Sequence, residues 1–154
     1  MNTQFLTNDG QQHARSQLEY LRTVKLAEVA HYLREAAQAG DVTRNAAFED
    51  ARFEQARLEA RIVELEQLLA TVQVIDLDQV PTDTVSLGSI VHLVTSDGRT
   101  YRYTIVGSYE ADPTAGRISY ESPVGKALLG RKAGDQVVAA APGGVKAYTI
   151  LGIE

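Results

Sequence analysis

Cysteine and tryptophan are both absent from this chain of 154 residues. The lack of cysteine excludes disulfide bridges and metal sites built on thiolates. No apolar run approaches the length that a membrane-spanning helix needs, so none is expected. The first ten residues lack the basic flank and apolar stretch of a signal peptide, which makes the cytoplasm the expected location. With 44% hydrophobic and 23% charged residues, the composition fits a globular protein of one medium or two small domains.

Positive charge is also in short supply. The chain has 15 Lys and Arg against 20 Asp and Glu, for a formal net charge of −5. A protein that binds nucleic acid by neutralising many phosphates needs a basic face, so this class is disfavoured. His13, His31 and His92 are scattered and lack the spacing of metal ligands. Any approach to RNA would have to be guided by another macromolecule.

The first 80 residues contain no proline and only two of the twelve glycines. Because proline and glycine are the main breakers of regular structure, this half is expected to form long helices with one interruption. The first helix is expected to begin just after Thr7, Asn8 or Asp9, any of which can act as its N-cap, and to run to residue 39.

The second helix carries a heptad pattern of inward positions, spaced alternately by four and three residues. These are Leu58, Ile62, Leu65, Leu69 and Val72, and the same phase continues back through Gln55, Ala51 and Phe48. The pattern predicts that this helix packs along the first one over most of its length.

The interruption at residues 40–45 is short. Gly40 is a typical helix stop, and Asp41, Thr43 or Asn45 can cap the helix that follows. A short connection forces two helices to run antiparallel. Each arm of about 30 residues spans on the order of 45 Å, so residues 40–45 form the exposed tip of a projecting hairpin.

The second half alternates apolar residues with turns. Residues 90–94 and 101–106 read as strands on either side of the turn Ser96-Asp97-Gly98. Further strands are expected at 117–120, 136–141 and 145–150, with a short helix within 125–130. The predicted fold class is α+β: a hairpin over residues 1–76, a linker at 77–87 and, at 88–154, a small antiparallel sheet with one helix on its face.

Several motifs, in this order, resemble the Gre family of bacterial transcription elongation (transcript-cleavage) factors, and GreA-like members in particular. They are Leu6-Thr7-x-x-Gly10, Gly40-Asp41 with Asn45, Val74-Ile75-Asp76, Ile105-Val106-Gly107, Glu110-Ala111-Asp112, Ile118-Ser119, Ser122-Pro123-x-Gly125-Lys126-Ala127-Leu128-Leu129-Gly130, Gly134-Asp135 and Pro142-Gly143-Gly144. The resemblance runs nearly end to end. It implies an FKBP-like fold for the C-terminal domain, which docks at the rim of RNA polymerase, and a hairpin that enters the polymerase secondary channel.

The tip departs from the family pattern. Gre factors carry an Asp and, three residues later, a Glu, which supply oxygen ligands for a second Mg²⁺ in the polymerase active site. Asp41 matches the first carboxylate, but Arg44 stands at the second position. A guanidinium stays charged and repels a cation. The resemblance therefore implies an elongation regulator with weak or no cleavage stimulation, like the non-cleaving Gre-factor homologues. Asp41 would meet metal only within the polymerase complex, and the chain would have no cofactor of its own.

The resemblance assigns two further sites. One is the polymerase-docking loop, where an acidic residue precedes Ser-Pro; here it consists of Glu121, Ser122 and Pro123. Arg52 matches a basic position that guides the 3′ end of nascent RNA. The implied partners are core bacterial RNA polymerase and, through it, the transcript, with the chain itself a monomer.

Other interpretations stay open at this point. The chain could be an active GreA-like cleavage factor that uses Asp41 alone, a prolyl isomerase with a coiled-coil appendage, or a coiled-coil adaptor. Asp41 alone would serve as a helix cap, and Arg52 as an ordinary surface arginine. Because no complete catalytic constellation is present, the chain is expected to be an accessory factor and not an enzyme in its own right.

Overall fold

The computed structural model describes residues 4–39, 42–141 and 143–154, with the backbone alone for residues 39 and 42–45. The chain divides into two compact units. One unit is Gln11–Thr71, and the other joins the chain up to Gly10 with Val72–Glu154. The sequence had placed residues 1–76 in the hairpin. The contacts instead assign both ends of that range to the unit that contains the C-terminal sheet.

The first arm of the hairpin consists of α1 (Asn8–Tyr20), a π-helical segment (Leu21–Lys25) and α2 (Leu26–Ala39). The Thr7 hydroxyl accepts a hydrogen bond from the Gly10 N–H at 3.0 Å, so Thr7 is the N-cap among the three candidates. Inward-facing Leu21 and Leu26 are five residues apart, a step too long for one face of an α-helix. The wider π turn between them absorbs the extra residue and keeps both side chains half-buried.

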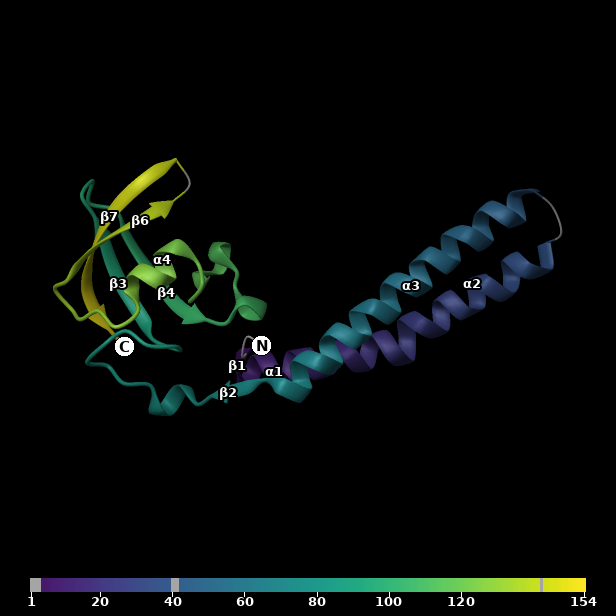
Figure 1. Ribbon diagram of the computed structural model, residues 1–154, viewed down its shortest axis with the longest axis horizontal. Coiled ribbons are helices and arrows are strands. Elements are labelled where there is room, and N and C mark those ends of the chain that lie inside the picture. The colour runs from purple at the N-terminus through teal and green to yellow at the C-terminus, as the bar shows by residue number, and fades with distance from the viewer. Residues whose placement is uncertain (1–3, 40–41, 142) are drawn as a thin grey trace. The chain divides into compact units, whose positions relative to one another are not determined.

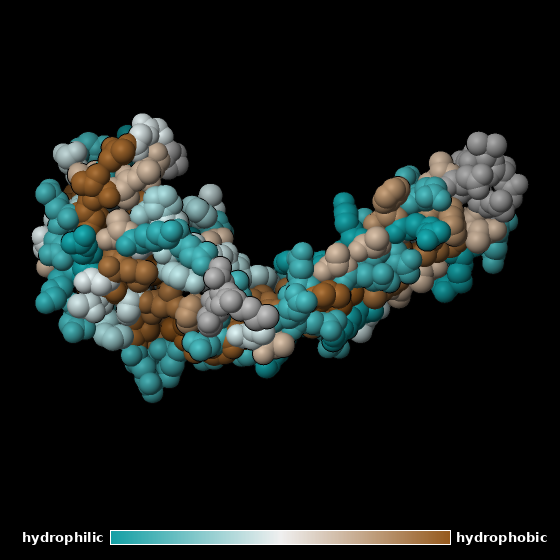
Figure 2. All heavy atoms as spheres, viewed as in Figure 1, coloured by the Kyte–Doolittle hydropathy of each residue, from teal (hydrophilic) through white to brown (hydrophobic). Residues whose placement is uncertain are grey.

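The second arm is α3 (Val42–Thr71), which lies beside α2 and runs in the opposite direction (Figure 1). Leu58, Ile62 and Leu65 are buried, at 8%, 7% and 1% exposure, as the heptad pattern predicted. Thr43 and Asn45 lie inside α3, so neither caps it. Hydrophilic residues cover much of the hairpin face seen in Figure 2. No helix in the described residues is long and apolar enough to cross a membrane.

The C-terminal domain is a five-stranded sheet in the order β5-β4-β3-β7-β6 (Figure 1). Its strands are β3 (Ile90–Thr95), β4 (Thr100–Val106), β5 (Arg117–Ser119), β6 (Gln136–Ala141) and β7 (Gly144–Ile153). The α+β fold class is confirmed, with one correction to the sheet. The sheet is antiparallel, as expected, except at one edge, where β5 pairs parallel with β4. Two short 3₁₀ turns, Ser108–Glu110 and Pro113–Ala115, bring the chain back to make this pairing possible.

The core of this domain lies between the sheet and α4 (Pro123–Leu128). Its buried residues are Val85, Val91, Leu93, Ile105, Ile118, Leu128, Val137, Ala139, Tyr148 and Ile150. Val85 belongs to the segment expected to be a linker, yet it is only 2% exposed. Its N–H donates to the Arg131 carbonyl at 2.8 Å, and its carbonyl accepts from the Gly130 N–H at 2.8 Å. The end of the expected linker is therefore part of the domain.

A second, two-stranded sheet was not expected from the sequence. β1 (Phe5–Thr7) pairs parallel with β2 (Gln73–Ile75). The backbone of Gly107 passes so close to β1 that a Cβ there would lie 2.1 Å from the Phe5 carbonyl oxygen. Glycine at this position therefore permits the N-terminal strand to pack against the C-terminal domain.

Candidate functional site

The hairpin tip holds the two residues on which the cleavage prediction depends. Asp41 lies outside the described residues. The backbone of Arg44 lies in the first turn of α3, three residues after the position of Asp41. The roles predicted for both side chains remain predictions that rest on the sequence.

Arg52 lies two to three turns further along α3 and is exposed. Its guanidinium carbon is 5.9 Å from the centroid of the Phe48 ring, within range of a cation–π contact. Phe48 is half-buried and its ring lies against the guanidinium end of Arg52, whose side chain is exposed to solvent. This geometry is compatible with contact to a phosphate, and the RNA-guiding role of Arg52 remains a prediction.

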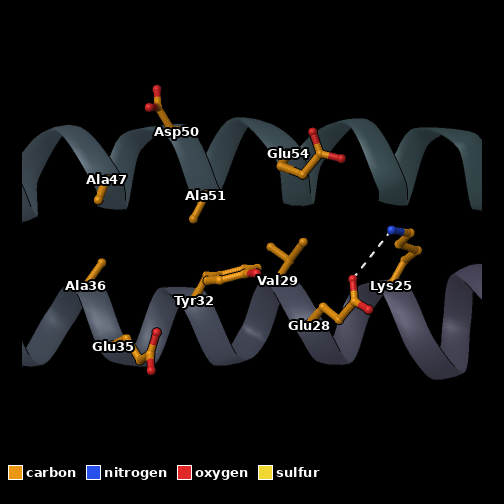
Figure 3. Close-up of a pocket in the computed structure, with 10 residues that line it drawn as sticks. All are labelled: Lys25, Glu28, Val29, Tyr32, Glu35, Ala36, Ala47, Asp50, Ala51 and Glu54. Atoms are coloured by element: carbon orange, nitrogen blue, oxygen red, sulfur yellow. Dashed lines mark hydrogen bonds and ion pairs between the residues drawn. The ribbon is translucent and has the colours of Figure 1, made fainter.

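Near the tip a groove of about 730 Å³ opens between α2 and α3. It is lined by Lys25, Glu28, Val29, Tyr32, Glu35, Ala36, Ala47, Asp50, Ala51 and Glu54. Figure 3 shows Ala36, Ala47 and Ala51 directed into the space between the helices. Their methyl groups are too short to fill it, whereas leucine and isoleucine close the interface farther from the tip.

The carboxylates around this groove do not form a metal site. No group of three or more His, Asp or Glu side chains in the described residues could hold a metal ion. Three of the four acids at the groove already pair with a cation or histidine: Glu28 with Lys25, Glu35 with His31, and Glu54 with Arg57.

The predicted docking loop joins β5 to α4. The Ser122 hydroxyl accepts from the Gly125 N–H at 3.1 Å and donates to the Ser119 carbonyl at 2.6 Å, so Ser122 caps α4. Pro123 occupies the first helical position, which suits its fixed φ angle. A Cβ at Gly125 would lie 2.1 Å from the Ser119 carbonyl oxygen. The loop is thus closed tightly on itself and holds Glu121 at an exposed position.

Glu121 is the one acidic residue of this loop, and both of its carboxylate oxygens accept hydrogen bonds. The Tyr120 hydroxyl donates to one oxygen at 3.1 Å, and the Ser108 hydroxyl donates to the other at 3.2 Å. The Glu121 N–H donates to the Ser119 hydroxyl at 3.0 Å. Burial, and then the hydrogen bond to Glu121, raise the pKa of Tyr120 above its ordinary value of 10.0. Tyr120 therefore stays protonated, and a donor, at neutral pH.

The sequence placed Glu121 in the predicted docking loop but did not indicate its hydroxyl partners, Ser108 and Tyr120. Tyr120 is adjacent in sequence, and nothing in its context indicated which way its hydroxyl would turn. Ser108 is 13 residues earlier, and only the unexpected parallel pairing of β5 with β4 brings it to the loop.

Comparison with known proteins identifies the family. Residues 4–74 match the family model described as transcription elongation factor, N-terminal, and residues 80–154 match that described as transcription elongation factor, GreA/GreB, C-term. The chain belongs to the GreA/GreB family of transcription elongation factors. The resemblance in the sequence motifs is thereby confirmed, and with it the general function in transcription elongation.

Relatives of this GreA/GreB-family chain match over almost the entire length. It is 44% identical to transcription elongation factor GreA of Clostridium kluyveri over 149 residues, which cover 96% of this chain and 94% of the relative. It is 45% identical to GreA of Thermoanaerobacter pseudethanolicus, with 96% and 95% covered. Among solved structures, GreA factor homolog 1 of Thermus thermophilus is 31% identical, with 99% of each chain covered and a TM-score of 0.46.

Proposed function

We propose that this chain docks on core bacterial RNA polymerase, inserts its hairpin into the secondary channel, and stimulates transcript cleavage weakly or not at all. It would act in the cytoplasm as a monomeric accessory factor and not as an enzyme in its own right. One observation carries the second half of the proposal. A family member that aligns with its relatives over 96% of its length has Arg44 three residues after Asp41, where the family motif has a glutamate.

The donor set at the tip does not fit a divalent cation. Mg²⁺ is held by oxygen ligands, usually carboxylates, and Asp41 is the only carboxylate in residues 40–45. Arg44 has no acceptor atom, and its charge cannot be removed by deprotonation within a protein. Glu49 and Asp50 are exposed on α3, but they lie a turn or more beyond Arg44. The tip therefore lacks the second carboxylate that completing a metal centre would need.

The rest of the chain supports binding. The loop that carries Glu121 is closed by the Ser122 cap and the Pro123 helix start, so the acid is presented on a rigid support. The long antiparallel pair of α2 and α3 supplies the reach that entry into a channel requires. Binding and cleavage are therefore separate properties here, and only cleavage depends on the tip chemistry.

A competition assay tests this proposal. A backtracked elongation complex is treated with an active GreA relative, and increasing amounts of this chain are added. We expect the rate of transcript cleavage to fall as this chain occupies the same channel, and a Glu121→Lys variant to compete less well. If the chain leaves cleavage by the relative unchanged at any concentration, channel binding is contradicted. If the chain alone cleaves as fast as the relative, it is an active GreA-like factor that uses Asp41.

A further inference from the structure

Two hydrogen bonds hold the Glu121 carboxylate in one orientation. Its two hydrogen-bond donors, the hydroxyls of Tyr120 and Ser108, come from different segments and are both neutral. None of the ion pairs in the described part of the chain involves Glu121. The result is an exposed acid whose side-chain orientation is fixed by two neutral donors.

The two donors are themselves fixed. The Tyr120 ring meets the Phe5 ring edge to face, with centroids 5.7 Å apart and an interplanar angle of 86°. The Ser108 hydroxyl lies 3.2 Å from the Ser119 hydroxyl, which in turn receives the Glu121 N–H. The orientation of Glu121 thus depends on the N-terminal strand, the turn after β4 and the end of β5.

The remaining acceptor capacity of Glu121 indicates what it binds. An ionised carboxylate has about four lone-pair sites, two on each oxygen. Tyr120 uses one on the first oxygen, and Ser108 uses one on the second. No other hydrogen bond described for the chain reaches these oxygens, so each can accept one of the two parallel N–H groups that a guanidinium presents to a carboxylate. A lysine ammonium has three donors but lacks the planar pair of parallel N–H groups that matches two carboxylate oxygens.

We propose that Glu121 receives an arginine side chain of the polymerase in a two-bond contact, and that Tyr120 and Ser108 are positioning residues for it. This inference rests on the proposed docking function and specifies the partner's chemistry. Pre-orientation matters because a free glutamate side chain loses rotamer freedom when it is immobilised. In the folded chain the Glu121 side chain has already lost part of this freedom. Docking therefore loses less entropy, which raises the affinity without any further contact.

Removal of a single hydroxyl tests the positioning role. Tyr120→Phe keeps the ring and its contact with Phe5 but removes the donor to Glu121. We expect the dissociation constant for core polymerase to rise roughly threefold to tenfold, the usual value of one hydrogen bond. Ser108→Ala should act in the same direction. Tyr103→Phe is the matched control, since Tyr103 lies in β4 and none of the hydrogen bonds described for the chain joins it to the loop. The affinity of this variant should equal that of the wild type.

A double-mutant cycle separates positioning from general loop structure. In a Glu121→Gln background the charge is gone, so Tyr120→Phe should change the dissociation constant by less than about twofold. If Tyr120→Phe costs as much in that background as in the wild type, Tyr120 stabilises the loop independently of Glu121, and the inference is overturned. Equal affinity of Tyr120→Phe and the wild type overturns it as well.

Chemical footprinting tests the identity of the partner group. Core polymerase is treated with phenylglyoxal, which modifies arginine, in the presence of wild-type chain or of Glu121→Gln at equal occupancy. We expect one polymerase arginine to be protected by the wild type and to stay reactive with the variant. Protection of a lysine against an amine reagent instead, or of neither group, contradicts the inference. Failure of the wild type to bind polymerase at all is a different result, because it removes the docking function itself.

Discussion

The Glu110 carboxylate accepts two hydrogen bonds from Thr7, which lies 103 residues earlier in the sequence. One oxygen of its carboxylate accepts from the Thr7 N–H at 2.8 Å, and the other accepts from the Thr7 hydroxyl at 2.5 Å. The same hydroxyl receives the Gly10 N–H at the start of α1. Glu110 thereby completes the N-cap of the first helix and fastens β1 to the C-terminal domain, within one compact unit.

The contact between Glu110 and Thr7 is predicted to require glycine at position 10. A Cβ at position 10 would lie 2.3 Å from the Glu110 carboxyl carbon, so Gly10→Ala must displace the carboxylate from Thr7. We expect the free energy of unfolding to fall by about 1–3 kcal/mol, the cost of hydrogen bonds to a charged group. Urea denaturation of the full chain measures it.

Whether Gly10→Ala lowers or raises the free energy of unfolding should depend on Glu110. In a Glu110→Ala background the space beside Gly10 is open, and alanine is favoured over glycine within a helix by roughly 0.5–1 kcal/mol. Gly10→Ala should then be neutral or slightly stabilising. If it is equally destabilising in both backgrounds, the close approach to Glu110 is not the cause.

Asp97 is predicted to make the turn between β3 and β4 sensitive to acid. Its side chain accepts hydrogen bonds from the Thr95 hydroxyl and, at 3.2 Å, from the Arg99 N–H. The hydrogen bond from Thr95 is the main reason that the pKa of Asp97 lies below its ordinary value of 3.8. A carboxyl whose pKa is lowered by folding stabilises the fold above its unfolded pKa, and this contribution is lost as pH falls through the folded pKa.

Asp97→Asn measures that contribution. The variant should be less stable than the wild type at neutral pH, and the difference should shrink once the pH drops below about 3.8. Urea denaturation at a series of pH values follows the two proteins. A stability difference that stays constant into strong acid would show that ionisation of Asp97 plays no part.

Filling the groove near the tip is predicted to stabilise the hairpin. Ala51 is half-buried and directed toward α2 (Figure 3), so Ala51→Leu adds apolar surface to a space that alanines leave open. We expect a gain of about 1 kcal/mol, less than half of the roughly 2.4 kcal/mol that full burial of the three added carbons would contribute at ~0.8 kcal/mol each. Loss of the helical circular dichroism signal on heating measures it.

Ala56→Leu provides the control for that variant. Ala56 is exposed on the same helix, so it experiences the same change in helix propensity without any groove to fill. Its midpoint should stay within a degree or two of the wild type. If Ala56→Leu raises the midpoint as much as Ala51→Leu does, the groove is not the source of the gain.

Local patterns predicted much of the fold. The heptad positions Leu58, Ile62 and Leu65 are buried, and the strand expected at 136–141 is β6 with the same bounds. These features depend on residues close in sequence, where spacing alone determines which side faces the core. The five-residue step from Leu21 to Leu26 was visible as loose spacing, but its π-helical explanation was not.

Features that join distant segments could not be predicted in this way. The parallel pairs β1–β2 and β4–β5 leave no turn signal, because their strands are not joined by a tight hairpin. The hydroxyl partners of Glu121 and the contact between Glu110 and Thr7 depend on those pairings. At the tip, by contrast, the sequence is the source of the argument, because the replacement of the second carboxylate by Arg44 after Asp41 is a fact of the sequence.

The most direct test of the central claim is transcript cleavage in a purified backtracked elongation complex by the wild type, Arg44→Gln and Arg44→Glu, each at equal occupancy. We predict that the wild type and Arg44→Gln are weak or inactive, because neither has a second tip carboxylate. Arg44→Glu should cleave about tenfold faster or more, which corresponds to at least ~1.4 kcal/mol off the barrier. Fast cleavage by the wild type, unchanged in Arg44→Glu, would contradict the account and show that Asp41 suffices.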